Sequence, residues 1–254
     1  MSMELIPGIY NYCDRWCKRC AFTMRCMVFA QENKYFGDQQ EHDLKSDAFW
    51  KTMHDIFNDT KSLIQETAAE HGIDLNAVDQ EELDRDMKAV KRIQRRARRH
   101  PLVVCATRYA KMVNDWFQRH ESSFQQKGDD LESLELMQIE GHDPQAEAVS
   151  LTDACDVIRW YQLQIAVKFC RALSSDGESE LLDEETMLTD SLGSAKVALL
   201  GIDRSLAAWT ILRHAFPEHA DEIIDILVDL DRLRHAAECR LPDARAFVRP
   251  GLDD

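Results

Sequence analysis

The stretch "LTDACDVIRWYQLQIAVKFCRALSS" at residues 151–175 contains neither glycine nor proline and indicates one long helix. Thr152 or Asp153 is suited to cap its N-terminus, because a short oxygen-bearing side chain can accept a hydrogen bond from the first turn. The same scarcity of turn residues holds along the whole chain, which has nine glycines and six prolines in 254 residues. Many short strands would need more turn signals than that, so the sequence favours helices throughout.

Outward from this stretch, five further segments have the apolar spacing or the capping residues of helices. They are 46–72, 79–99, 101–124, 191–215 and 218–241. We therefore predict an all-α protein, an irregular bundle of six or seven helices with an N-terminal cysteine-rich metal module. The expected division is a metal-binding module at 1–45, N-terminal helices at 46–127, an acidic linker at 128–150 and a C-terminal helical region at 151–254.

The composition is that of a folded protein, with 44% hydrophobic and 30% charged residues. The first residues show no basic stretch followed by an apolar run, so no signal peptide is expected. The most apolar segment, 195–212, carries Lys196, Asp203 and Arg204, which disfavours a membrane span. A cytoplasmic location is the expectation, and structural disulfides are rare there.

One segment opposes the overall net charge of −15. The tract "KAVKRIQRRARRH" at 88–100 holds seven Lys and Arg residues and no acid, which leaves −22 on the rest of the chain. Such segregation can mark a site for nucleic acid or an anionic protein partner, with Arg95, Arg96, Arg98 and Arg99 as contact residues. The alternative is a basic helix that docks on an acidic surface of the same protein, and the acidity of the remaining chain favours that alternative.

Four cysteines gather near the start of the chain in "CDRWCKRCAFTMRC" at 13–26. Their spacing is C-x3-C-x2-C-x5-C, which places Cys13, Cys17, Cys20 and Cys26 as candidate metal ligands. Closely spaced thiols in a reducing compartment indicate a metal site more often than a disulfide. Basic residues are interleaved with them, and positive neighbours stabilise thiolates. The other four cysteines lie singly within helical segments and are expected to be small core residues.

Iron–sulfur cluster and zinc are the two candidate groups for these thiols. Structural zinc sites usually combine two C-x2-4-C pairs across a longer loop, whereas all four cysteines here are compressed into one short segment. That compression suits a cubane cluster, in which each iron takes one thiolate. Residues 17–26, "CKRCAFTMRC", resemble the C-x2-C-x5-C loops of iron–sulfur DNA glycosylases and RecB-like iron–sulfur nucleases, including the aromatic Phe22 two residues after the middle cysteine. The resemblance implies the ligand spacing of a [4Fe–4S] cluster and no DNA chemistry.

The two most apolar segments, 151–175 and 191–215, also carry charged residues. Because buried charges must be paired or serve a site, we hypothesise a pocket for an anionic ligand between these helices. The alternative is a structural ion-pair network. The pocket residues would be Tyr161, Lys168, Arg171, Lys196, Asp203 and Arg204.

Sequence motifs narrow the function only partly. Signatures of metalloproteases, P-loop enzymes, dinucleotide-binding folds and serine hydrolases are absent. No histidine has a Glu three positions earlier, as carboxylate-bridged di-iron bundles require. The leading expectation is a metal-binding helical protein whose cluster is structural, redox-sensing or electron-carrying, with a redox or protein partner. The alternatives are an enzyme acting on an anionic small molecule, and a zinc-containing nucleic-acid or protein interaction module that uses the basic tract.

Overall fold

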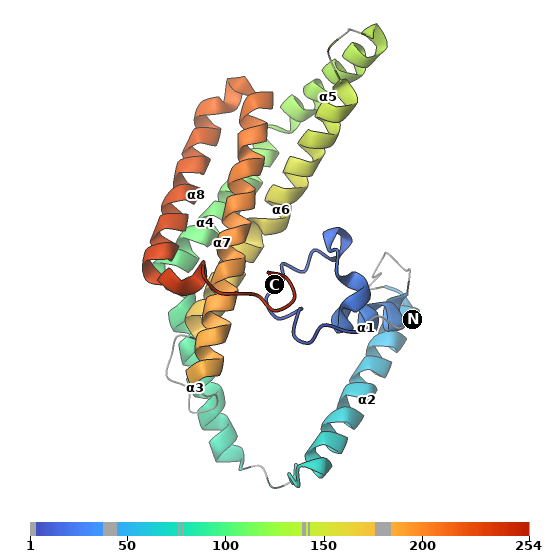
Figure 1. Ribbon diagram of the computed structural model, residues 1–254, viewed down its shortest axis with the longest axis vertical. Helices are drawn as coiled ribbons and strands as arrows, with labels where there is room; N and C mark the ends of the chain where they lie inside the picture. The colour runs from blue at the N-terminus through green and yellow to red at the C-terminus, as the bar shows by residue number, and fades with distance from the viewer. Residues whose placement is uncertain are drawn as a thin grey trace. The chain divides into compact units, whose positions relative to one another are not determined.

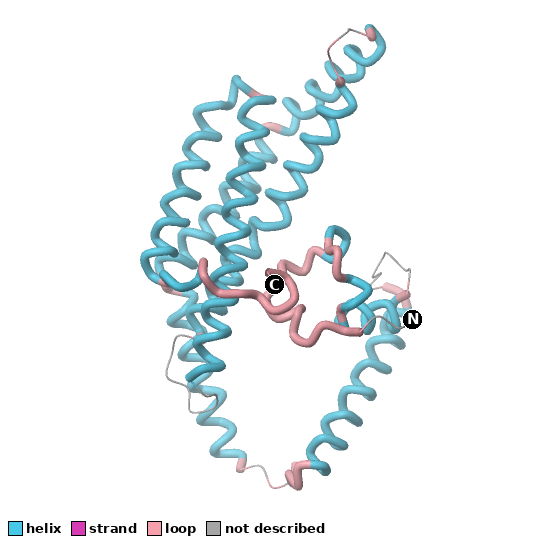
Figure 2. The backbone as a smooth tube through the Cα atoms, viewed as in Figure 1, coloured by secondary structure: helices cyan, strands magenta, loops and turns pink. Residues whose placement is uncertain are grey.

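The computed structural model describes residues 4–37, 45–75, 77, 79–138, 141, 143–175 and 184–253. Within them the chain forms helices and no strands (Figures 1 and 2), so the predicted all-α class is confirmed. The described portion holds eight α-helices, against the six or seven expected. They are α1 (Met27–Phe36), α2 (Asp47–Glu70), α3 (Gln80–Arg98), α4 (Pro101–Arg119), α5 (Glu121–Met137), α6 (Pro144–Ser174), α7 (Glu184–Ala215) and α8 (Ala220–Arg240). Short 3-10 helices are η1 (Cys17–Arg19), η2 (Thr23–Arg25), η3 (Pro217–His219) and η4 (Pro242–Ala244).

The chain divides into two compact units. The cysteine unit comprises Met1–Arg92 together with Arg249–Asp254, and the helical unit comprises Ile93–Val248. The acidic linker expected at 128–150 is instead mostly helix, since α5 runs to Met137 and α6 begins at Pro144. The helix start predicted at 151 is therefore too late, because proline fits the first turn of a helix and the Asp143 side chain caps it. The Asp143 carboxylate accepts a hydrogen bond from Ala146 N at 2.9 Å.

The helical unit is built around α4, α6, α7 and α8, which pack in a closed ring of neighbours, with α5 against α6. Its fully buried large side chains include Trp116, Trp209, Phe169 and Phe216. The long helices α6 and α7 lie side by side (Figure 1) and share the most extensive helix contact. Gly201 of α7 permits a close approach to α6, because a Cβ there would lie 2.9 Å from Tyr161 Cδ1.

The cysteine unit has a much smaller apolar core. Among its described residues only Ile9, Tyr12 and Ala68 are buried hydrophobic residues. Helices α1 and α2 meet through a hydrogen bond from Tyr35 Oη to Asp59 Oδ2 at 2.7 Å, on the exposed surface. So little apolar burial is typical of small domains that depend on a disulfide or a metal for stability.

No helix in the described part of the chain is both long enough and apolar enough to cross a membrane.

Candidate metal centre

The cysteine segment folds as a series of tight turns that bring its four thiols to one place. The Asp14 carboxylate accepts a hydrogen bond from Trp16 N at 3.1 Å, and Arg15 between them has a left-handed φ of 58°. A non-glycine residue in this conformation costs about 1–2 kcal/mol, and such strain clusters at functional sites. The turn lets Cys17 begin η1, whose last bond runs from Cys20 N to Cys17 O at 3.1 Å.

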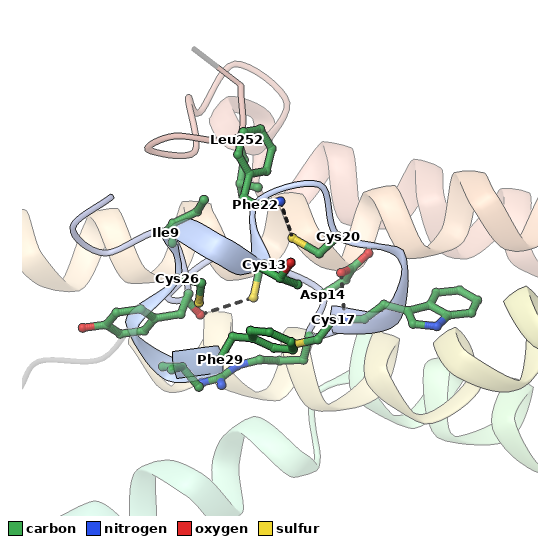
Figure 3. A pocket seen from close by; sticks show the side chains of 14 residues that line it. Ile9, Cys13, Asp14, Cys17, Cys20, Phe22, Cys26, Phe29 and Leu252 are labelled. Carbon is green, nitrogen blue, oxygen red and sulfur yellow. Dashed lines mark hydrogen bonds between the residues drawn. The ribbon is translucent and has the colours of Figure 1, made fainter. Parts of the chain in front are cut away.

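Cys13, Cys17, Cys20 and Cys26 line a single pocket (Figure 3). About 410 Å³ of it is not filled by protein atoms, part of which is open to solvent. Burial raises the pKa of the Cys17 thiol most, and nearby negative charge on Glu32 and then on the other three cysteines raises it further. Negative charge on the other three sulfur atoms therefore disfavours a thiolate at Cys17, and a bound cation would relieve this repulsion.

The surroundings of the sulfur atoms suit a thiolate-bound group. The backbone N–H of Phe22 donates to Cys20 Sγ at 3.4 Å, a bond that a thiolate also accepts. The Cys13 thiol donates to Tyr10 O at 3.5 Å, and this bond is given up when Cys13 becomes a thiolate ligand. Apolar side chains of Ile9 and Phe29 line the same pocket. Hydrogen bonds to sulfur and exclusion of water are two means by which proteins set the potential of an iron–sulfur cluster.

Two basic side chains of the cysteine segment make contacts within the cysteine unit. The Arg19 guanidinium stacks over the Trp16 ring at 4.0 Å, and Arg25 Nε donates to Glu4 O at 3.1 Å. Both contacts hold a cation within the unit that carries the four thiols.

The last residues of the chain pack on this pocket as a C-terminal strap, defined here as residues 249–253. Leu252 lines the pocket, and Gly251 lies against Ile6 (Figure 3 shows Leu252). The strap is closed on itself, since Arg249 Nε and the Asp253 carboxylate are 3.0 Å apart and mostly buried. The cysteine segment and the C-terminal strap thus build one site.

The other four cysteines belong to the helical unit and do not line this pocket. All eight cysteines are in the described part of the chain, and none forms a disulfide. Cys105, Cys155 and Cys170 are half-buried, and Cys239 is exposed, so they are less buried than expected. Burial raises the pKa of Cys155 to about 11, which keeps it a protonated thiol.

The residues predicted to form an anion pocket are engaged with different partners within the helical unit. Arg204 donates to the Tyr161 hydroxyl, so the structure brings these two together. Arg171 Nε donates to Asp190 Oδ2 at 3.0 Å. Such contacts correspond to the ion-pair alternative, in which each charge stabilises a neighbouring part of the fold.

The remaining members are similarly dispersed. Lys196 donates to the backbone oxygen of Phe247. Asp203 accepts from Arg245 Nη2 at 3.2 Å, which links α7 to the segment after α8. Lys168 is half-buried on α6. These contacts do not gather Lys168, Arg171, Lys196 and Asp203 around one ligand.

The basic tract forms the last turns of α3 and the residues that follow. Arg95, Arg96, Arg98 and Arg99 are all exposed. Within the described residues none of the four makes an ion pair, so the docking of this tract on an acidic surface of the same chain is not observed there.

A second group of possible ligands was missed by the sequence. His120, His219 and Glu222 place one ligand atom each within 4.8 Å of one another. His120 Nε2 lies 3.2 Å from Glu222 Oε2, and Arg119 Nη1 lies 2.7 Å from the same oxygen. The hydrogen bond from His120 lowers the pKa of Glu222 most, and Arg119 lowers it further. The signal was a His-x2-Glu pair, the reverse of the Glu-x2-His order that a di-iron bundle requires.

Comparison with protein-family models, curated proteins and solved structures gives no match for the chain. The functional assignment below therefore stands on the residues and their geometry.

Proposed function

We propose that Cys13, Cys17, Cys20 and Cys26 bind a [4Fe–4S]-type cluster with a structural, redox-sensing or electron-transfer role. The observation that carries this proposal is the convergence of four thiols on one pocket in a unit with three buried hydrophobic residues among those described. A unit with so small a core needs another source of stability, and metal–thiolate bonds supply it upon folding. Eight cysteines without a disulfide suit a reducing compartment, so we infer a cytoplasmic protein.

Three features favour iron and sulfur over zinc. The ligands are compressed into fourteen residues with a single C-x2-C pair. The spacing of 17–26 resembles that of the cluster loops in iron–sulfur DNA glycosylases and RecB-like nucleases, from which we transfer ligand spacing alone. The pocket is lined largely by apolar side chains and places an N–H donor on Cys20 Sγ, as cluster sites do.

The ligand set also limits what such a cluster would do. Four protein thiolates fill the four cluster positions, which leaves none for a substrate. Activation of a substrate by a vacant iron site is therefore not part of the proposal, whereas electron transfer and sensing need no vacant position. The pocket is partly open to solvent, which would allow an electron-transfer partner or an oxidant to approach.

A serine series tests the proposal directly. Cys13→Ser, Cys17→Ser, Cys20→Ser and Cys26→Ser are each expected to abolish or bleach the brown colour of protein purified without air. The matched controls are serine variants at Cys105, Cys155, Cys170 and Cys239, which should keep the wild-type visible spectrum. A colourless wild-type protein that contains zinc would exclude the cluster and support the zinc alternative. A colour that survives all four pocket variants would overturn the site.

A further inference from the structure

A second cluster of ligand-type side chains lies wholly within the helical unit, where two helix junctions meet. His120 stands between α4 and α5, and its backbone N–H bonds to Trp116 O at 3.1 Å. His219 ends η3, and Glu222 lies in the first turn of α8. The packing of the bundle thus holds His120 beside two residues that lie about a hundred positions later in the chain, His219 and Glu222.

The two imidazoles are fixed before any ligand arrives. The His120 ring lies 3.9 Å from the His219 ring and 4.9 Å from the Trp116 ring, measured between centroids. Ser123 Oγ is 2.9 Å from His219 Nε2. The His120 and His219 side chains are 11% and 17% exposed, so both are restrained while an edge of the site remains accessible. Such restraint is what a metal site needs in its ligands.

The donor atoms are those of a transition-metal site, and all three lie within 4.8 Å of one another. We propose that His120, His219 and Glu222 bind a divalent transition-metal ion of the zinc type. Two imidazoles and one carboxylate are typical ligands of zinc and of iron(II), whereas calcium and magnesium prefer oxygen alone. Ligands of a tetrahedral zinc lie about 3.4 Å apart, and His120 Nε2 and Glu222 Oε2 are 3.2 Å apart.

The neighbouring charges allow a cation to enter. Two neutral imidazoles and one carboxylate carry a single negative charge, which a divalent ion more than balances. Arg119 is the competing cation, at 2.7 Å from Glu222 Oε2, but its side chain is 57% exposed. An exposed ion pair of this kind contributes little, so Arg119 can turn into solvent when the metal binds. Three protein ligands leave one tetrahedral position for water.

Zinc titration of the purified protein tests this site separately from the cysteines when wild type is compared with triad variants that keep all four pocket thiols. Wild type is expected to bind one equivalent of Zn²⁺ at the triad. The His219→Gln and Glu222→Gln variants should bind this equivalent at least about a hundredfold more weakly. The matched controls are His214→Gln, an exposed histidine on α7, and Asp221→Asn, an exposed acidic residue next to Glu222 in the first turn of α8. Binding by both triad variants at wild-type affinity and stoichiometry would overturn the proposal.

Two further readouts keep the test decisive. If His219→Gln loses its helical circular dichroism, the nearly isosteric Glu222→Gln variant carries the comparison. Co²⁺ bound to the triad should show d–d bands without thiolate charge transfer. The difference spectrum, wild type minus Glu222→Gln, should therefore contain d–d bands and no thiolate band. A wild-type Co²⁺ spectrum that Glu222→Gln reproduces in full would refute the site, whatever metal the cysteines hold.

Discussion

The C-terminal strap makes a sharp prediction at Gly251. A Cβ at this position would lie 2.5 Å from Ile6 Cγ2, far inside van der Waals contact. Gly251 also has φ of +69°, a backbone conformation that residues other than glycine rarely adopt. Gly251→Ala should therefore push the strap away from the cysteine pocket.

The size of the effect follows from the strain of the positive φ and from the clash of the added Cβ with Ile6. The left-handed conformation costs an alanine about 1–2 kcal/mol, and repacking around an inserted methyl costs about 1–3 kcal/mol. Because each 1.4 kcal/mol changes an equilibrium tenfold, the lower sum of about 2 kcal/mol raises the population of the open strap at least about 25-fold. Gly72 is the matched control, with φ of +67° and no atom within 4 Å of its Cβ position.

Carboxypeptidase digestion measures the opening. When the strap opens and closes faster than it is cut, the rate of trimming follows the open population. Removal of Leu252, followed by mass spectrometry, should be at least about 25-fold faster in Gly251→Ala than in wild type, and within about fivefold of wild type in Gly72→Ala. Equal trimming of Gly251→Ala and Gly72→Ala would refute the packing of the strap on Ile6.

Three further predictions concern the helices. Gly201→Ala should lower the free energy of unfolding in urea by about 1 kcal/mol, because overpacking against α6 exceeds the gain in helix propensity. Gly128→Ala, in the interior of α5 with no atom within 4 Å of its Cβ position, should raise the free energy of unfolding by about 0.5–1 kcal/mol. If both alanine variants changed the free energy of unfolding in the same direction, the close approach at Gly201 would be contradicted. Tyr109→Phe should cost about 1–3 kcal/mol, because the buried Trp209 Nε1 loses its acceptor at 3.1 Å. Burial raises the pKa of Tyr109 to about 12, so wild-type stability should fall as pH rises from about 10 to about 12, and a phenylalanine variant with the same fall would exclude Tyr109 as the cause. A fourfold glutamine variant of the basic tract should unfold within about 0.5 kcal/mol of wild type, whereas a larger loss would indicate docking within the chain. It carries substitutions at Arg95, Arg96, Arg98 and Arg99.

The sequence pattern predicts the helices well where apolar residues recur at helical spacing, and less well where turn residues mislead. Gly128 and Pro144 marked a loop, yet one is tolerated inside α5 and the other starts α6. The first is possible because no atom crowds its Cβ position, and the second because a proline at N1 lacks only an N–H that needs no partner.

How far apart the ligands lie in the sequence explains why one candidate site could be predicted and the other could not. The cysteine ligands were visible because all four lie within one short segment. The packing of Leu252 on their pocket, and the meeting of His120 with His219, depend on contacts between residues far apart in sequence. Spacing rules describe one helix or one loop at a time, so they cannot predict either of these two contacts.

Quantification of iron, acid-labile sulfide and zinc in protein purified without air tests the central claim most directly. The cysteine site predicts about four iron and about four sulfide per chain, with both lost in Cys20→Ser. Protein that is folded and contains zinc at the cysteines, or no metal at all, would contradict the iron–sulfur assignment.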